Sequence, residues 1–301
     1  MFGTMGCRKT TELTVQDVKI PDQEAPAINF KRPDVIRNDL AKGDFRNGIV
    51  TYIDTENSAY VRREWRFQVE DGTSRVKNLS MVAPPYLCEK TEIKFQYLAD
   101  GFIDQIISAR KDSCAEYVSK WVYKYNYEEK LLVSIVGKNY YTSATADNLY
   151  MNISEDFFTY HPDGRVHEIY STHREASNKN YTYHKISLIY DRNDNVIEVI
   201  REGHETGQYD EKFTFTYDDN KNPLEGLYIF GNLQLPSYGY AGSLGPRFLS
   251  KNCIKAIKSE YLYHSQNPRI DYYDSKTRDN KVIDFGYRIS SIDWMRYFIK
   301  Y

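Results

Sequence analysis

The chain has 301 residues, a formal net charge of −2 and 28 tyrosines, against 14 phenylalanines and 3 tryptophans. A general nucleic-acid binder needs a basic footprint to displace counterions, so this charge excludes nucleic acid as a predicted partner. No stretch approaches the roughly 20 apolar residues of a membrane-spanning helix. Tyrosine suits a sheet whose faces are partly exposed to solvent, because its ring is apolar and its hydroxyl is polar.

The first residues indicate a lipid anchor. Thr4-Met5-Gly6-Cys7 is similar to the end of a bacterial lipobox, in which a small residue precedes the acylated cysteine, although leucine is usual where Thr4 stands. We therefore interpret residues 1–7 as the remnant of a signal with its lipobox, and we predict lipidation at Cys7. Residues 8–40, rich in polar residues and proline, are predicted to be a polar tether. The alternative is an ordinary cysteine near the N-terminus.

Residues 41–86 are predicted to form leading β-strands. Apolar and polar residues alternate over 48–53, 60–69 and 74–82, which is the two-residue period of a half-buried strand. Pro84-Pro85 marks a boundary before a repeat domain predicted for residues 87–301. The sequence leaves open whether the leading strands join the sheet of the repeats.

An aromatic strand that ends on a tyrosine and enters a polar turn recurs along the repeat domain. Repetition every 30 residues or so indicates a fold assembled from one small unit. The repeat tyrosines are Tyr97, Tyr125, Tyr160, Tyr190 and Tyr217.

The clearest copy runs from Phe95 to Ile106 and contains an Asp-Gly pair. This pair is predicted to form a two-residue hairpin turn, because it accepts positive φ at both central positions. In such a hairpin the residue numbers of every two paired residues add up to the same constant. Phe95 should therefore pair with Ile106, and Tyr97 with Asp104.

The second clear copy, residues 158–169, superposes on the first without a gap. The same arithmetic pairs Phe158 with Ile169 and Tyr160 with His167. It also places His161 and His167 on opposite faces of the sheet, which would make them poor joint ligands of a metal.

A stretch rich in glycine and proline, residues 231–248, breaks the rhythm. Long loops in compact domains are usually functional or disordered. Tyr238, Tyr240 and Arg247 are candidate ligand-binding residues that would form a stacking platform for a sugar or a partner protein. The alternative is that the loop covers the edge of the sheet. Strand patterns return near the C-terminus, and the final strand is expected to be paired; residues 249–258 fit a helix or a strand.

The repeat units resemble the tyrosine–aspartate (YD) repeats of the RHS class. They are still more similar to uncharacterised bacterial envelope lipoproteins built from diverged YD-like units. Residues 222–227, Asn-Pro-Leu-Glu-Gly-Leu, followed later by residues 249–252, are similar to a late stretch of those lipoproteins. The resemblance covers residues 91–301. It implies an antiparallel meander and a lipoprotein of the bacterial cell envelope at the outer membrane, and it implies no catalytic residues.

The predicted fold class is therefore all-β: an antiparallel meander of YD-like hairpin repeats that forms an extended twisted sheet with little helix. Motifs for nucleophilic catalysis, nucleotide binding and metal binding are absent from the sequence, so no catalytic residue, metal site or cofactor is predicted. Cys88 and Cys114 are spaced so that they would fall on neighbouring strands. A disulfide and two free thiols both remain open for them.

The predicted function is that of an envelope-anchored lipoprotein with a tyrosine-rich β-repeat surface for non-catalytic binding or scaffolding. The predicted partners are the membrane, through the lipid anchor, and a glycan or an envelope protein. The alternative is an enzyme that acts on envelope polysaccharide through acidic residues of the repeat face. A fragment of an RHS-type shell is disfavoured, because such shells need many more repeats.

Overall fold

The structure, a computed structural model, divides the chain into residues 1–30 and a compact unit formed by residues 31–301. It describes residues 31–37, 39–57, 62–82, 89–112, 117–143, 146–175, 181–203, 210–227, 249–262, 268–279, 281–288 and 294–301. The predictions made for Cys7, for Cys88 and Cys114, and for Tyr238, Tyr240 and Arg247 lie outside these residues and stay predictions.

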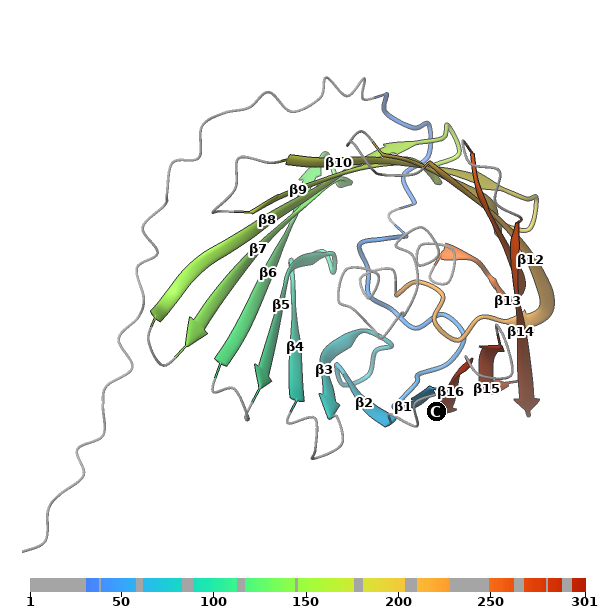
Figure 1. Cartoon of the computed structure of the whole chain (residues 1–301), viewed down its shortest axis with the longest axis horizontal. Helices are drawn as coiled ribbons and strands as arrows, with labels where there is room; N and C mark the ends of the chain where they lie inside the picture. The colour runs from blue at the N-terminus through green and yellow to red at the C-terminus, as the bar shows by residue number, and fades with distance from the viewer. Residues whose placement is uncertain are drawn as a thin grey trace, which may run out of the picture. The chain divides into compact units, whose positions relative to one another are not determined.

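Within these ranges the chain forms sixteen antiparallel strands (Figure 1). They are β1 Tyr52–Asn57, β2 Arg62–Val69, β3 Val76–Val82, β4 Glu89–Tyr97, β5 Ile103–Asp112, β6 Tyr117–Glu128, β7 Leu131–Ser143, β8 Ala146–Tyr160, β9 Val166–Glu175, β10 Tyr181–Tyr190, β11 Val196–Gly203, β12 Glu211–Lys221, β13 Asn252–Tyr261, β14 Arg269–Arg278, β15 Lys281–Arg288 and β16 Trp294–Lys300. The all-β antiparallel meander is confirmed, and residues 252–258 belong to a strand, not a helix.

The sheet closes on itself, which corrects the predicted extended sheet. Each strand pairs with its neighbours in sequence, and β1 also pairs with β16, so that Ile53 lies opposite Ile299. The predicted pairing of the final strand is therefore confirmed, and β1–β3 share one sheet with the repeats. Closure removes both sheet edges, whose unpaired backbone groups would otherwise invite aggregation.

The two faces of the wall differ in polarity. Along β4, Ile93 and Phe95 are buried while Lys94 and Gln96 are exposed, as the two-residue period requires. The buried face is the interior, because the N-terminal segment runs inside the ring of strands (Figure 1). Phe45 of that segment packs edge-on against Phe67 of β2, with ring centroids 5.4 Å apart.

The Asp-Gly turns differ from the prediction. Phe95 pairs with Ile106 as expected, but Tyr97 pairs with Ile103 instead of Asp104 because the register shifts after Gln96. The Leu98 amide donates to the Phe102 carbonyl at 2.8 Å, and only Gly101 of the Asp-Gly pair has positive φ, 88°. This is a three-residue loop with a glycine bulge, which also suits an Asp-Gly sequence.

The other repeat turns vary this geometry. In the second copy Phe158 pairs with Ile169 as predicted, but Tyr160 pairs with Val166 instead of His167. In the copy whose strand ends on Tyr190, Asp194 takes the place of the glycine and has a φ of 63°. The two-residue turn predicted for Asp-Gly occurs instead between β6 and β7, where Glu129 and Lys130 have φ of 46° and 70°.

Candidate functional site

Five tyrosines at or near strand ends bond to the strand that precedes their own. Each side-chain hydroxyl donates to a backbone carbonyl in the first or second residue of an earlier strand. The observed pairs are Tyr97 with Val76 (2.5 Å), Tyr127 with Ile103 (2.7 Å), Tyr160 with Leu132 (2.6 Å), Tyr217 with Val196, and Tyr301 with Val282 (3.0 Å). We call these contacts the tyrosine latches.

Burial raises the pKa of the latch tyrosines, in Tyr301 to about 12, so their hydroxyls stay protonated and act as donors at neutral pH. In the second unit the latch is Tyr127, while the repeat tyrosine Tyr125 lies two residues earlier and is buried. Tyr160 is buried and the other latch tyrosines are half-buried, so their bonded hydroxyls have a structural role between strands.

A cation stacks on several of the repeat tyrosines. Arg75 lies over the Tyr97 ring and Arg165 over the Tyr190 ring, each with its guanidinium carbon 4.9 Å from the centroid. Lys281 lies 4.6 Å over Tyr301 in the same way. Each cation immediately precedes the first valine of its strand, so the basic residue and the repeat tyrosine form one recurring contact between hairpins.

The N-terminal segment crosses the interior of the barrel at the end where the tyrosine latches lie. We call residues 31–37 and 39–50 the strap. Its Leu40, Ala41, Phe45 and Val50 are buried. Its backbone continues the hydrogen bonding of the wall, because the Ala41 carbonyl accepts from the Ile103 amide at 2.8 Å. In the described part of the predicted tether, residues 31–37 and 39–40, Pro33 and Leu40 are buried, while five residues from Lys31 to Ile36 are exposed.

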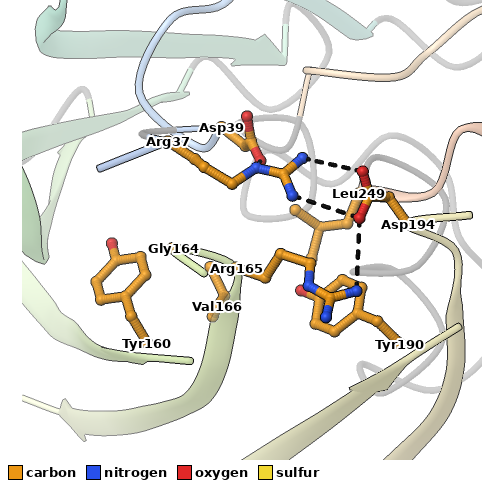
Figure 2. A pocket seen from close by; sticks show the side chains of 9 residues that line it. All are labelled: Arg37, Asp39, Tyr160, Gly164, Arg165, Val166, Tyr190, Asp194 and Leu249. Atoms are coloured by element: carbon orange, nitrogen blue, oxygen red, sulfur yellow. Dashed lines mark hydrogen bonds and ion pairs between the residues drawn. The ribbon is translucent and has the colours of Figure 1, made fainter. Parts of the chain in front are cut away.

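Three cations from distant parts of the chain converge on one carboxylate, Asp194, in the turn between β10 and β11. Figure 2 shows two of them, Arg37 and Arg165. Both terminal nitrogens of Arg37 on the strap lie 3.4 Å from the Asp194 oxygens. Arg165 Nη1 lies 3.4 Å from Oδ1, and Lys251 Nζ lies 2.9 Å from Oδ2. We call these four residues the Asp194 hub.

The electrostatics of the Asp194 hub favour its ionised form. Burial alone would raise the pKa of Asp194, but hydrogen bonds from Lys251 and Arg37, together with their charges, lower it below 3.8. Burial likewise opposes the charge of Arg37, yet neighbouring Asp39, 3.0 Å away, and Asp194 raise its pKa. The hub is therefore a charged and mutually compensated lock between the strap and the wall.

A second lock holds the middle of the strap. Arg46 pairs with Asp39 at 2.7 Å and with Glu225 at 3.2 Å, and Asn47 donates to Glu225 at 3.0 Å. Glu225 lies in the turn after β12, far from the strap in sequence. The two locks attach the strap to turns that follow different repeats.

Two glycines let these turns approach the strap closely. Gly164 has φ of 83°, and a Cβ there would lie 2.2 Å from the Val35 carbonyl oxygen. Gly226 has φ of 87°, and its Cβ would lie 2.8 Å from the Asp44 carbonyl oxygen. Only glycine combines this backbone conformation with so close a contact.

The predicted binding loop begins and ends beside this site. On one side, Leu227 is fully buried two residues after Glu225. On the other side, Leu249 lines a small cavity of about 10 Å³ with Arg37 and Asp194, and Ser250 is fully buried. The cavity has room for about one water. The residues that flank 228–248 are therefore fixed to the strap and the Asp194 hub.

The two histidines predicted to lie on opposite faces are close together. The His161 and His167 rings lie 4.4 Å apart, centroid to centroid. The two-residue alternation of side chains between the sheet faces does not continue across the turn, because the glycine bulge adds a residue to one strand. Burial, then the charge of His161, lowers the pKa of His167. No group of three potential metal ligands occurs among the described residues.

Neither a protein-family model nor a curated protein matches the chain. Solved structures share part of its architecture. A porin-like protein from Bacteroides vulgatus has a TM-score of 0.43 and 13% identity, covering 84% of this chain and 98% of its own. One from Bacteroides uniformis has a TM-score of 0.46 and 11% identity, covering 86% and 100%. A structure described as TcdB2-TccC3-TEV has a TM-score of 0.31 and 11% identity, covering 75% and 12%. All three TM-scores are below 0.5.

No described helix is long and apolar enough to cross a membrane. The outer wall is charged where its side chains are described. Between β9 and β13, cross-strand ion pairs join Lys185 to Glu202 and Lys212 to Glu198. Lys258 pairs with Glu260 along β13. At the end that carries the tyrosine latches, the barrel therefore has a largely apolar interior. Its exterior is charged.

Proposed function

We propose that this protein is a lipid-anchored component of the bacterial envelope, in which a closed barrel serves non-catalytic binding or scaffolding. The observation that carries the proposal is the charged outer wall. A lysine or arginine that faces lipid near the middle of a bilayer costs about 2–4 kcal/mol. A wall with many such residues is unsuited to the interior of a bilayer, so insertion into the membrane is assigned to an anchor outside the wall. Cys7 is the candidate for that anchor.

The end of the barrel that the strap occupies supports a binding role for the predicted loop at 231–248. The described residues Leu227 and Ser250 on either side of it are buried, and Glu225 is bonded to the strap, so the frame that carries the loop is rigid. Rigid frames commonly present binding loops. Tyr238, Tyr240 and Arg247 in that loop supply aromatic rings and a cation, the residue types enriched in recognition surfaces. The ligand class proposed is an envelope glycan or an envelope protein.

The anchor is tested by expressing the natural gene with its upstream region and measuring the intact mass and detergent partition of the product. We expect a diacyl or triacyl mass and membrane partition, both lost in Cys7→Ala. The matched control is Cys253→Ala, which removes a buried thiol of the barrel and should keep the lipid mass. An unmodified protein that partitions into water would contradict the anchor.

The binding role is tested on a glycan array and against isolated envelope polysaccharide. The combined variant Tyr238→Ala, Tyr240→Ala and Arg247→Ala should lose binding. The control Tyr272→Ala, at a residue 63% exposed on β14, should retain binding. Turnover of a polysaccharide that the protein binds would replace this proposal with the enzyme alternative.

A further inference from the structure

Four lysines on one part of the outer wall stand out because none of them forms an ion pair among the described residues, although the charge of Lys94 acts on Glu92. Lys94, Lys111 and Lys120 are exposed and Lys138 is half-buried. They lie on the consecutive strands β4, β5, β6 and β7, which run side by side in Figure 1. We call the outward faces of these four strands the lysine wall.

The register places the four cations on one surface. Lys94 pairs with Ile107, Ile107 with Val122 and Val122 with Lys138, so the two lysines share a row. With strands about 4.8 Å apart, this row spans roughly 14 Å. Lys120 lies in the adjacent row, two residues along β6 from Val122. The lysines therefore face the same direction within reach of one extended partner.

The lysine wall also contains an unfavourable contact. Lys111 lies directly opposite Lys90, and like charges in that position destabilise a sheet. Lys90 has a partner in Glu92, at 2.7 Å, but Lys111 has no described ion pair. An anionic surface outside the protein would relieve this repulsion.

Elsewhere on the described wall, several lysines are neutralised, although Lys77 of β3 and Lys255 of β13 are exposed without a described ion pair. Lys185 pairs with Glu202, Lys212 with Glu198 and Lys258 with Glu260. Lys276 lies 3.4 Å from Asp284. The protein as a whole has a net charge of −2. The clustering of four unpaired lysines on adjacent strands is thus a feature of β4–β7 and not a consequence of a basic composition.

We propose that the lysine wall docks on the anionic headgroup surface of a membrane. The aliphatic residues between the lysines include Val118, which is 36% exposed, and Ile107, Val122 and Val136, which are half-buried. A broad wall with separated ammonium groups matches a lattice of headgroup charges, which needs no groove or fixed hydrogen-bond geometry. A polysaccharide chain is better matched by a groove with stacking rings. The biological role of this contact rests on the proposed location of the protein in the cell envelope.

The test uses full-length protein carrying Cys7→Ala, so that no lipid anchor contributes. Its binding is measured by sedimentation with vesicles of phosphatidylcholine alone and of phosphatidylcholine with phosphatidylglycerol. We expect binding only to the anionic vesicles, weakening as salt is added. The intact-mass experiment on Cys7 decides the anchor separately, so failure of one proposal is distinguishable from failure of the other.

Two matched variants locate the contact. The wall variant combines Lys94→Gln, Lys111→Gln, Lys120→Gln and Lys138→Gln. The control variant combines Lys185→Gln, Lys212→Gln, Lys258→Gln and Lys276→Gln, and it removes the same amount of charge from the paired side. The wall variant should bind anionic vesicles at least about tenfold more weakly, and the control within about twofold of the parent.

Three results would overturn the proposal: equal loss in both variants, equal binding to both vesicle types, or no vesicle binding by the parent protein. Polygalacturonate serves as a soluble polyanion. Binding of polygalacturonate without binding of vesicles would assign the wall to an anionic polysaccharide.

Circular dichroism and urea unfolding of both variants establish that each keeps the barrel. If the wall variant does not fold, reversal of single lysines, starting with Lys120→Glu, replaces it.

Discussion

Arg37 and Asp194 are 157 residues apart in sequence, yet both terminal nitrogens of the guanidinium lie 3.4 Å from the two carboxylate oxygens. The pair joins the strap, which enters the barrel before the first strand, to a turn between β10 and β11. Both side chains are about three-quarters shielded from solvent. The contact therefore couples the start of the folded body to its far side and makes the strap part of the barrel's stability.

Removal of this contact should weaken the whole fold. Arg37→Ala is expected to lower the free energy of unfolding by about 1–2 kcal/mol, because Asp194 loses one of its three cations while partly buried. Urea unfolding followed by circular dichroism measures the change. Arg66→Ala is the control, since its pair with Glu64 is largely exposed and should contribute less than about 0.5 kcal/mol. Equal losses in the two variants would contradict a special role for the strap lock.

The Asp194 hub should also make stability depend on pH. The pKa of Asp194 is lowered in the folded state, so its contribution is fully present above the unfolded value of 3.8 and is lost as pH falls through the folded pKa. The stability difference between the wild type and Asp194→Asn should therefore shrink between about pH 5 and pH 2. Unfolding titrations at several pH values measure this difference.

Glu211 provides a control of opposite sign. Burial raises the pKa of its carboxyl, despite the nearby Arg201, above the usual 4.5. Its contribution is present below the unfolded pKa and declines as pH rises through the folded one. Relative to Glu211→Gln, the wild type should thus become less stable as pH rises from 4. A parallel trend in the two comparisons would show that general charge repulsion, not the hub, sets the pH dependence.

The turn glycines offer a test of how closely the strap is packed. Gly164→Ala should cost more than about 3 kcal/mol, because it adds a collision with the Val35 carbonyl to the strain of positive φ. Gly72→Ala has similar backbone strain, with φ of 72°, but a Cβ there meets nothing within 4 Å. It should cost about 1 kcal/mol. Thermal unfolding of both variants measures the difference, and equal costs would mean that the strap gives way at Gly164.

The tyrosine latches predict a specific hydroxyl effect. Tyr160→Phe leaves the Leu132 carbonyl without its 2.6 Å bond and should lower stability by about 1–2 kcal/mol. Tyr272→Phe removes a hydroxyl from a ring that is 63% exposed and should leave stability unchanged within about 0.5 kcal/mol. Urea unfolding compares them. An unchanged midpoint for Tyr160→Phe would show that water replaces the latch.

Much of the fold follows from local patterns in the sequence. The alternation around Phe95 predicts both strands of the first clear hairpin and their central pairing with Ile106, because burial of one face fixes the register. The turn itself was predicted incorrectly, since Asp-Gly is compatible with two loop lengths. Which loop forms depends on what surrounds it, and at Gly164 the surroundings include the strap.

The Asp194 hub was beyond the reach of sequence reasoning for a different reason. Its residues Arg37, Arg165, Asp194 and Lys251 come from four separate segments, and none belongs to a motif of fixed spacing. One local signal was present: a basic residue just before the first valine of a repeat strand, as at Arg75 and Arg165. The repeat tyrosine on which that residue stacks belongs to the next hairpin, which only the register reveals.

The sequence by itself determined that this chain is an antiparallel all-β meander, because strand periodicity and hairpin turns are local properties of a few residues. Only the tertiary structure decided that the meander closes, because the pairing of Ile53 with Ile299 joins strands at opposite ends of the chain. Closure gives the wall an inside and an outside. That division places the tyrosines in latches, places the strap within the barrel and leaves the unpaired lysines facing outward.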